Sequence, residues 1–397
     1  MESTDNSEWV YLDHNATTPL NPHVQAVVIN QLSQFGNPSS IHWAGRKSKT
    51  ILRKSRESLA RFLNASPLEL IFTSGGSESN NTVIQGVFST SNKNEFICSA
   101  VEHPSVLKTM KYIESQGARV HRIPVNRNGQ LDLEFYKKHC GPQTALVSVM
   151  AANNETGTVF PIEEMVKIAH SQGALFHTDA VQTLGKLKID LKKWNVDYAS
   201  FSAHKFYALK GVGLLYAKKG VPQIPLIHGG AQERFRRGGT ENILGVASFG
   251  AAAQTLSQEV EKNIQRSLEL RNHMETEIQK NLPGVKIVAN LEPRLTNTSS
   301  LLIEGIDGET LLISLDIKGF AVSTGAACSS GNPEPSPVLL AMGFSRSEAQ
   351  TSLRVSLGWE STEVQVQAFI DELISTVLRL RKLNNSQVNL QETSIEL

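Results

Sequence analysis

ALFHTDAVQ (residues 174–182) and VDYASFSAHK (residues 196–205) contain the two short apolar segments that decide the fold. The first stops at Asp179, and the second stops just before Lys205. Apolar runs of this length, bounded by polar residues, are typical of strands buried in a parallel sheet. Ligands bind such sheets beyond the carboxyl ends of the strands. We therefore expect Asp179 and Lys205 to face one binding site.

The same pattern repeats over residues 68–220, where strand-like runs alternate with helical stretches that close on glycine. Six strands are predicted, at residues 68–73, 95–100, 145–150, 174–180, 196–203 and 211–217. This alternation predicts an α/β fold with a mostly parallel central sheet and helices on both faces.

A different pattern follows a long helical segment that we expect at Val246–Asn281. Shorter strands and helices are predicted from NTSSLLIEG, GETLLISLDIKG, FAVST and LRVSLG, which lie within residues 297–358. A chain of 397 residues exceeds one compact core. We predict a large domain at 16–260 and a smaller α+β domain made of 1–15 and 261–397.

Composition narrows the class of protein. Lysine and arginine total 39 against 38 acidic residues, so charge gives no support for direct binding to nucleic acid. We find neither a signal peptide nor a run long enough to span a membrane, and we expect a cytoplasmic protein. Three cysteines without a CxxC pair favour neither a disulfide framework nor a metal site.

A lysine and a carboxylate at neighbouring strand ends suit pyridoxal 5'-phosphate (PLP), which needs a lysine for its Schiff base and an anion beside its ring nitrogen. Asp179 could instead cap the next helix, and Lys205 could be a surface lysine. The surroundings of Lys205 favour the cofactor: Ser202 and His204 flank it, and the glycines of KGVG follow. A desolvated lysine has a lowered pKa and attacks carbonyls as a neutral amine.

The segment TSGGSESNN (residues 73–81) follows one predicted strand and opens a helix. Amide groups at a helix N-terminus favour a phosphate, so Gly76 and Ser77 are candidates for binding it. In the alternative interpretation, Ser77 is only an N-cap.

Three more polar side chains, two after other strands and one just beyond Asp179, could contact the same ligand. His103, which precedes Pro104, could stack on a pyridine ring and transfer protons, or simply begin a helix. Asn154 could bind a ring substituent or build a turn. Gln182 is expected in the first turn of the helix after Asp179 and could point the same way.

Two arginine-containing segments complete the candidate site. RRGGTEN (residues 236–242) contains Thr240 and suits a second phosphate contact or an ordinary exposed loop. Arg354 alternates with Leu353 and Val355 in the strand LRVSLG. Its guanidinium suits a substrate carboxylate, although a structural ion pair is the alternative.

Cys328 lies among Ser, Thr, Ala and Gly in VSTGAACSSGNPEP. Such a segment, about 323–337, buries little, so we expect a mobile and accessible nucleophile. Cys98 is expected to be buried in a strand, and Cys140 precedes Gly-Pro at a turn.

Together, YLDHNATTPL, HTDAVQ, SAHK, RGGTEN, TGAACSS and LRVSLG, in this order, resemble the cysteine desulfurases of the PLP-dependent class V aminotransferase family. The resemblance covers nearly the whole chain, and the loop around Cys328 is similar to that of the housekeeping class. It implies fold type I of PLP enzymes and a homodimer. It also implies conversion of L-cysteine to L-alanine, with sulfur passed as a persulfide to an iron–sulfur scaffold or a sulfur carrier for tRNA thiolation.

The resemblance implies a role for each candidate. Lys205 would hold PLP and Asp179 would pair with its ring nitrogen, while Cys328 would take the sulfur. His103 would stack on the ring and act in catalysis. The remaining implied contacts are with the phenolic oxygen (Asn154, Gln182), the phosphate (Gly76, Ser77, Ser202, His204, and Thr240 from a second subunit) and the substrate (Arg354, Asn154).

The chain departs from the family pattern at Ala208-Leu209, where Gly-Pro is common, at Gly76-Ser77 and at GAAC. None of these changes removes a group that the chemistry requires. Selenocysteine lyase activity is the nearest alternative, and a non-catalytic binding protein on a PLP fold is another. The sequence does not reveal the sulfur acceptor or any activator.

Overall fold

The computed structural model describes residues 9–325 and 334–395. A sheet of seven strands forms the centre of the larger part, in the order β2-β8-β7-β6-β5-β3-β4. Its strands are β2 (Leu70–Thr73), β3 (Glu95–Ser99), β4 (Arg119–Ile123), β5 (Thr144–Ser148), β6 (Leu175–Asp179), β7 (Tyr198–Ser202) and β8 (Gly213–Ala217). Only β8 runs against its neighbours, so the predicted mostly parallel sheet is confirmed.

All six predicted strands are present, and β4 is the strand that the sequence did not reveal. Its sequence, RVHRI, is mostly polar, because β4 is the edge strand and only Ile123 at its end is buried. A buried-strand criterion selects long apolar runs and therefore overlooks an edge strand of this kind.

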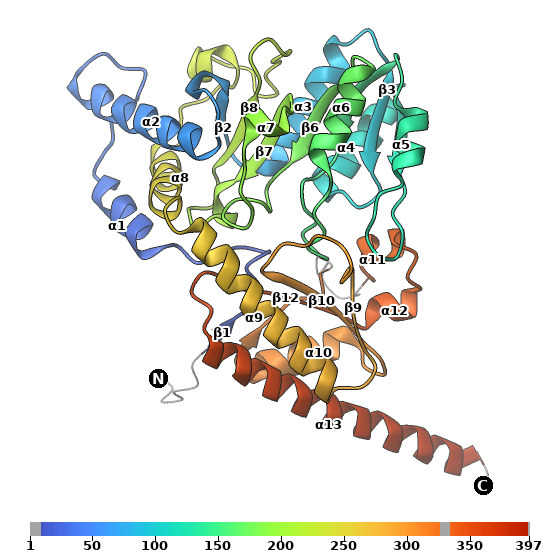
Figure 1. Cartoon of the computed structure of the whole chain (residues 1–397). Coiled ribbons are helices and arrows are strands. Elements are labelled where there is room, and N and C mark those ends of the chain that lie inside the picture. Colours follow the sequence, from blue (N-terminus) through green and yellow to red (C-terminus); the bar gives the residue numbers. More distant parts are fainter. Residues whose placement is uncertain (1–8, 326–333, 396–397) are drawn as a thin grey trace.

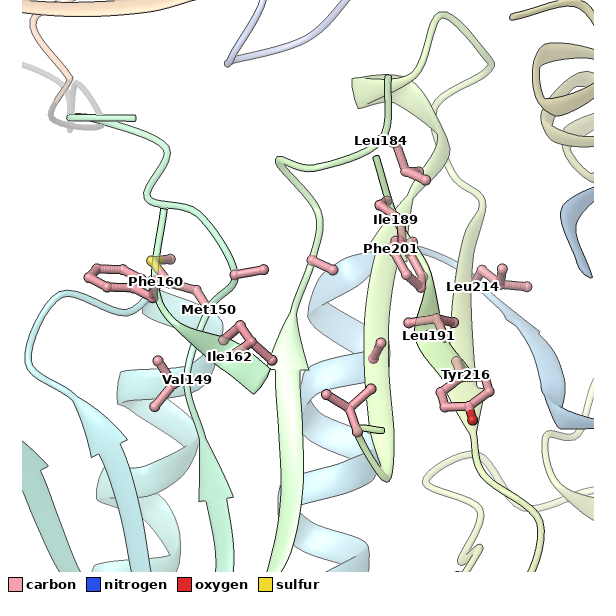
Figure 2. Close-up of a cluster of buried hydrophobic side chains, with 14 of the residues drawn as sticks. Val149, Met150, Phe160, Ile162, Leu184, Ile189, Leu191, Phe201, Leu214 and Tyr216 are labelled. Atoms are coloured by element: carbon pink, nitrogen blue, oxygen red, sulfur yellow. The ribbon is translucent and has the colours of Figure 1, made fainter. Parts of the chain in front are cut away.

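Helices cover both faces of the sheet (Figure 1). They include α1 (Pro22–Gln31), α2 (Trp43–Phe62), α3 (Gly76–Thr90), α4 (Pro104–Ser115), α5 (Leu133–His139), α6 (Ile162–Ser171), α7 (Leu191–Trp194) and α8 (Ile243–Leu256). The strands between them are buried along their whole length at β5, β7 and β8. Figure 2 shows part of this core, with Val149, Met150, Phe160 and Ile162 in one group and Leu184, Ile189, Leu191 and Phe201 in another.

The smaller part is an α+β arrangement around a three-stranded antiparallel sheet in the order β12-β10-β9. Its elements are β9 (Val285–Ile287), β10 (Thr298–Ile303), β12 (Ser352–Ser356), α9 (Val260–Asn281), α10 (Gly308–Ile317), α11 (Pro337–Ala341), α12 (Arg346–Gln350) and α13 (Glu363–Ile395). A short parallel pair joins β1 (Val10–Tyr11) to β11 (Phe320–Ala321). Figure 1 shows α9 and α13 side by side over this part.

The helical segment expected at Val246–Asn281 is two helices, α8 and α9, and the single-helix expectation was wrong. The chain leaves α8 at Ser257 and re-enters a helix after Glu259, whose φ of −115° departs from helical geometry. Most of α8 packs in the core of the large sheet, whereas α9 contributes Leu270, Met274 and Ile278 to the small one.

One hydrophobic cluster supports the small domain that the sequence predicted, although the largest cluster also takes in Val288, Leu302 and Val338 from that part of the chain. In the smaller cluster, Val10 and Leu12 pack with Leu270 and Phe369, which are far away in the sequence. We propose, on this basis, that residues 1–15 and 261–397 form the small domain and 16–260 the large one.

A tight helix crossing fixes α8 against α2. A Cβ added at Gly250 of α8 would come within 2.5 Å of the Cα of Ser55 in α2. The backbones therefore meet at a distance that only glycine permits.

We predict that Gly250→Val destabilises the protein by about 1–3 kcal/mol, since overpacking forces the two helices apart. Urea unfolding followed by circular dichroism measures the change. Gln254→Val, on the exposed face of the same helix, is the matched control. Equal midpoints for the two variants would contradict the tight crossing.

Candidate active site

A cavity of about 640 Å³ lies at the carboxyl ends of the central strands, where Leu312, Val322 and Ser323 of the smaller part close one wall. It brings together most of the side chains selected from the sequence. Its lining includes Gly76, Ser77, His103, Asn154, Asp179, Gln182, Ser202, His204, Lys205 and Arg354.

Thr240 does not line this cavity and is exposed to solvent. Cys328 lies outside the described residues. The described ends of its segment both approach Glu155: Ser336 Oγ donates to the Glu155 carboxylate, and a Cβ at Gly325 would come within 3.1 Å of Glu155 Oε2. Burial raises the pKa of Glu155 to about 7.

Lys205 follows β7 in a short 3₁₀ turn, Ala203–Lys205. Its Nζ donates to the backbone oxygens of Asn15 and Ala16, each at 2.5 Å. Burial, and then the nearby Arg354 guanidinium, lowers the pKa of Lys205 to about 8. A large fraction of this amine is therefore neutral near physiological pH and able to act as a nucleophile or a base.

Asp179 is the last residue of β6, and its carboxylate is held from two sides. Its Oδ1 accepts from the backbone amide of Val181 at 3.0 Å, and its Oδ2 accepts from Asn80 Nδ2 at 2.8 Å. These bonds hold the carboxylate in place at the cavity that Asp179 lines. The alternative role as a helix cap was wrong, because the residues after Asp179 form a turn and the next helix, α7, begins only at Leu191.

Asn80 is a site residue that the sequence reasoning missed. It lies in the first turns of α3, four residues after Gly76, so the two share a helix face. It lines the cavity, and its own Oδ1 is buried without a hydrogen-bond partner. The four-residue spacing from Gly76 was the signal that could have revealed it.

The N-terminus of α3 lies at the cavity, where Gly76 and Ser77 are part of the lining. Gly75 is its N-cap and supplies no side-chain hydrogen bond to the first amides of this 15-residue helix. The interpretation of Ser77 as the N-cap was therefore wrong. A Cβ on Gly76 would lie 2.6 Å from Val181 Cγ2, so glycine is required for the close packing beside Ser202.

His103 is the N-cap of α4, where its Nδ1 accepts from the Ser105 amide at 3.1 Å. His103 therefore caps α4 and also lines the cavity. Desolvation, aided by Lys205, lowers the pKa of His103. A neutral imidazole with Nδ1 engaged leaves Nε2 to exchange protons with a ligand.

Arg354 reaches the cavity from β12 of the smaller part. It is buried, forms an ion pair with Asp13 at 2.6 Å, and donates through Nη1 to the Asn154 backbone oxygen at 3.1 Å. Its Nε is buried without a partner. The structural ion pair expected as an alternative is present, and Arg354 also lines the cavity.

Asn15 was quoted in the sequence only as part of YLDHNATTPL, without a role. Its backbone oxygen accepts from both Lys205 Nζ and Gln182 Nε2, and its side chain donates to Thr298 Oγ1. Gln182 itself lies in a turn and not in a helix, because no helix forms before α7. Asn15 therefore joins the lysine to both parts of the chain.

The difference from the family's Gly-Pro at Ala208-Leu209 is accompanied by a hydrogen bond in the structure. The backbone amide of Leu209 donates to Ser248 Oγ of α8 at 3.1 Å. A proline at this position has no amide hydrogen and does not make that bond. The turn after Lys205 is thus tied to α8 by a contact that a Gly-Pro turn lacks.

Among residues 9–325 and 334–395, no group of three or more His, Cys, Asp or Glu side chains is placed to hold a metal ion. Over the same residues, no helix is both long and apolar enough to cross a membrane. Cys98 and Cys140 are free and buried. Burial raises the pKa of both thiols, which makes them poor nucleophiles.

The class-V aminotransferase family model matches residues 10–369. The cysteine desulfurase IscS of Dictyoglomus turgidum is 42% identical over 94% of this chain and 96% of its own. A solved NifS-like protein superimposes with a TM-score of 0.87 at 38% identity, covering 93% of this chain and 99% of its own. A structure of SspA in complex with cysteine gives a TM-score of 0.77 at 32% identity, covering 88% and 98%.

The chain therefore belongs to the class-V aminotransferases, the PLP-dependent enzymes that share fold type I. Within them it is a member of the cysteine desulfurase family. The resemblance and the fold class that the sequence motifs predicted are both confirmed.

We predict that PLP-free enzyme takes up PLP at a rate that rises as the pH passes through about 8, because only the neutral amine of Lys205 reacts. Arg354→Met should move this inflection upward, since the nearby guanidinium lowers the lysine pKa. Stopped-flow absorbance measures the rate. Arg379→Met, at an exposed position of α13, is the control. An inflection near 10.5 in the wild type would contradict the lowered pKa.

Proposed function

We propose that this protein converts L-cysteine to L-alanine and transfers the sulfur to Cys328 as a persulfide. The observation that carries the proposal is the Lys205 amine, with its lowered pKa, in one cavity with Asp179 and Arg354. Membership of the cysteine desulfurase family supports the same reaction.

The cavity fits PLP at each of its chemically distinct ends. Lys205 offers the amine, Asp179 a buried anion for the ring nitrogen, and the open N-terminus of α3 a place for the phosphate. We assign the phosphate contacts to Gly76, Ser77, Ser202 and His204, with Thr240 from a second subunit. When bound, PLP supplies an electron sink for negative charge that develops on the substrate.

The protein side chains then bind the substrate and move its protons. We assign the carboxylate of L-cysteine to Arg354, whose unpartnered Nε is available, with Asn154 beside it. Neutral Lys205 Nζ accepts the proton from the α-carbon, which its lowered pKa makes possible near pH 8. His103 covers the ring of the cofactor and exchanges protons through Nε2.

Sulfur transfer needs a nucleophile that the described cavity does not contain. We assign this step to Cys328 on the basis of its sequence motif. Its thiolate forms a bond to the substrate sulfur while the carbon–sulfur bond breaks, and the electron pair of that bond remains with the carbon fragment. Protonation of that fragment gives alanine, so no external oxidant or reductant is consumed.

We further propose a cytoplasmic homodimer that passes the persulfide sulfur to a protein acceptor, either an iron–sulfur scaffold or a carrier for tRNA thiolation. The exposed position of Thr240 supports a site completed by a second copy. Large apolar side chains exposed on nearby elements support an interface; they are Ile29, Leu32, Phe35, Ile41, Trp43 and Phe235.

Two alternative functions can be distinguished from this one by experiment. A selenocysteine lyase would turn over selenocysteine even after Cys328→Ala, because that reaction does not need the thiol. A non-catalytic binding protein on this fold would show no visible cofactor band and no turnover.

The central test is the absorbance spectrum of the purified protein before and after L-cysteine is added, with alanine quantified. We expect a visible band that shifts and stoichiometric alanine when a reductant regenerates the thiol. Lys205→Ala should lose the band and at least 1,000-fold in activity, on the order expected when an essential group is removed. A band without alanine would exclude L-cysteine as the substrate.

We predict that Cys328→Ser keeps the cofactor band and still binds L-cysteine, but releases sulfide at less than about a hundredth of the wild-type rate. Cys140→Ser is the matched control, since that thiol is buried and expected to be inert. Sulfide assay and mass spectrometry of the persulfide measure the two effects. A normal rate in Cys328→Ser would exclude this residue as the sulfur acceptor.

A further inference from the structure

Lys186 is a buried lysine beside the cavity that the proposed mechanism does not use. Its side chain is 7% exposed, and it lies four residues after Gln182. Its Nζ donates to Gln182 Oε1 at 2.7 Å and to Asn15 Oδ1 at 2.8 Å. A buried amine at this position requires an explanation, because burying a lysine is costly unless its hydrogens are matched by acceptors.

The number of acceptors matches a neutral amine. A neutral Nζ carries two hydrogens, and two side-chain oxygens receive them. Burial lowers the pKa of Lys186 well below 10.5, and the cationic Lys205 and Arg354 act in the same direction. Asp13 opposes them. Burial is the largest cause that lowers the pKa of the neighbouring His14, to about 4, so this imidazole is neutral as well.

This contact determines which way the Gln182 amide is turned. Because Oε1 accepts from Lys186, Nε2 is directed to the Asn15 backbone oxygen, at 3.0 Å. The reversed amide would place its oxygen against the Asn15 carbonyl, where two acceptors face each other, and would leave the Lys186 Nζ hydrogen without the Oε1 acceptor that it now has. The second Nε2 hydrogen is then the group that Gln182 can present to the cavity it lines.

We propose that Lys186 is a positioning residue that holds Gln182 so that an N–H, and not the carbonyl oxygen, faces the phenolic oxygen of bound PLP. This inference rests on the proposed function, because it assumes that PLP is bound with that oxygen near Gln182. Lys186 acts only through Gln182 and Asn15 and touches neither substrate nor cofactor.

The expected effect is on the titration of the cofactor band. A donor to the phenolic oxygen stabilises its deprotonated form, so the proton shared by that oxygen and the lysine nitrogen leaves at a lower pH. Without Lys186 the amide keeps only the Asn15 backbone contact of the two that orient it, so the donor is lost for part of the time and the midpoint rises. Loss of one ordinary hydrogen bond corresponds to a rise of about 0.5–1 pH unit.

The experiment compares the pH midpoint of the visible band in the wild-type holoenzyme and in Lys186→Met, which fills the buried site without donors. Lys188→Met is the matched control, because Lys188 is an exposed lysine, paired with Glu261, on the same stretch. We expect a rise of about 0.5–1 pH unit for Lys186→Met and no change for the control. An unchanged midpoint in folded Lys186→Met overturns the inference.

A double-mutant cycle separates positioning from a direct charge effect. In a Gln182→Leu background, Lys186→Met should add nothing to the midpoint shift, because the group through which it acts is gone. Additive shifts overturn the proposed route through Gln182.

If Lys186→Met does not fold, Lys186→Gln takes its place, since its shorter amide stays polar but does not reach Gln182 Oε1. An unchanged midpoint for this variant would also overturn the inference. A wild-type protein without any visible band would instead overturn the proposed function, so the two failures are distinguishable.

Discussion

The partial burial of several cations around one cavity is the constraint on which the site depends. Lys205, Lys186 and Arg354 lie close enough that each cation disfavours protonation of the lysines, and water is largely excluded from them. In such surroundings a lysine loses its proton, whereas an arginine guanidinium keeps its charge. The division of roles that we propose follows from this difference: Arg354 is left as a cation for an anionic ligand, whereas the pKa of each lysine is lowered.

The N-terminal strand region makes this arrangement possible because it connects the two parts of the molecule. Asp13 pairs with Arg354 of the small sheet, while the Asn15 backbone oxygen receives Lys205 from the large one. The proposed substrate-binding residue Arg354 and the proposed catalytic residue Lys205 are therefore joined through three residues of backbone, Asp13 to Asn15. A shift of the small sheet relative to the large one would disturb both groups together, which explains why they need a shared anchor.

The sequence predicted the parts of this site that depend on strand ends. Asp179 and Lys205 terminate short apolar runs, and parallel packing alone brings such ends to one edge. The sequence could not predict contacts between distant segments, because periodicity carries no information on which loop meets which. Asn15 and Lys186 were missed for this reason. Asn80 was missed although its spacing from Gly76 pointed to it, and β4 was missed because its sequence is mostly polar.

The family resemblance supplied the roles that geometry alone leaves open, and the structure adds what is particular to this chain. Leu209, in place of the more common proline, donates its amide to Ser248 and ties the turn after Lys205 to α8. α8 in turn packs against α2 without room for a side chain at Gly250. The turn that carries the reactive lysine is therefore braced through a continuous, tightly packed path.

The charge of the cavity favours a ligand that brings more than one negative group. Arg354 already shares the charge of Asp13, and Asp179 is satisfied by Asn80 and a backbone amide. The helix N-terminus of α3 and the buried Nε of Arg354 are the donors left without a side-chain acceptor in the described residues. These two donors around Lys205 suit different groups. The helix N-terminus suits a phosphate, and the Arg354 Nε suits a carboxylate. A phosphorylated aldehyde cofactor and an amino acid together satisfy both, and they bring the aldehyde and the amino group to the lysine between them.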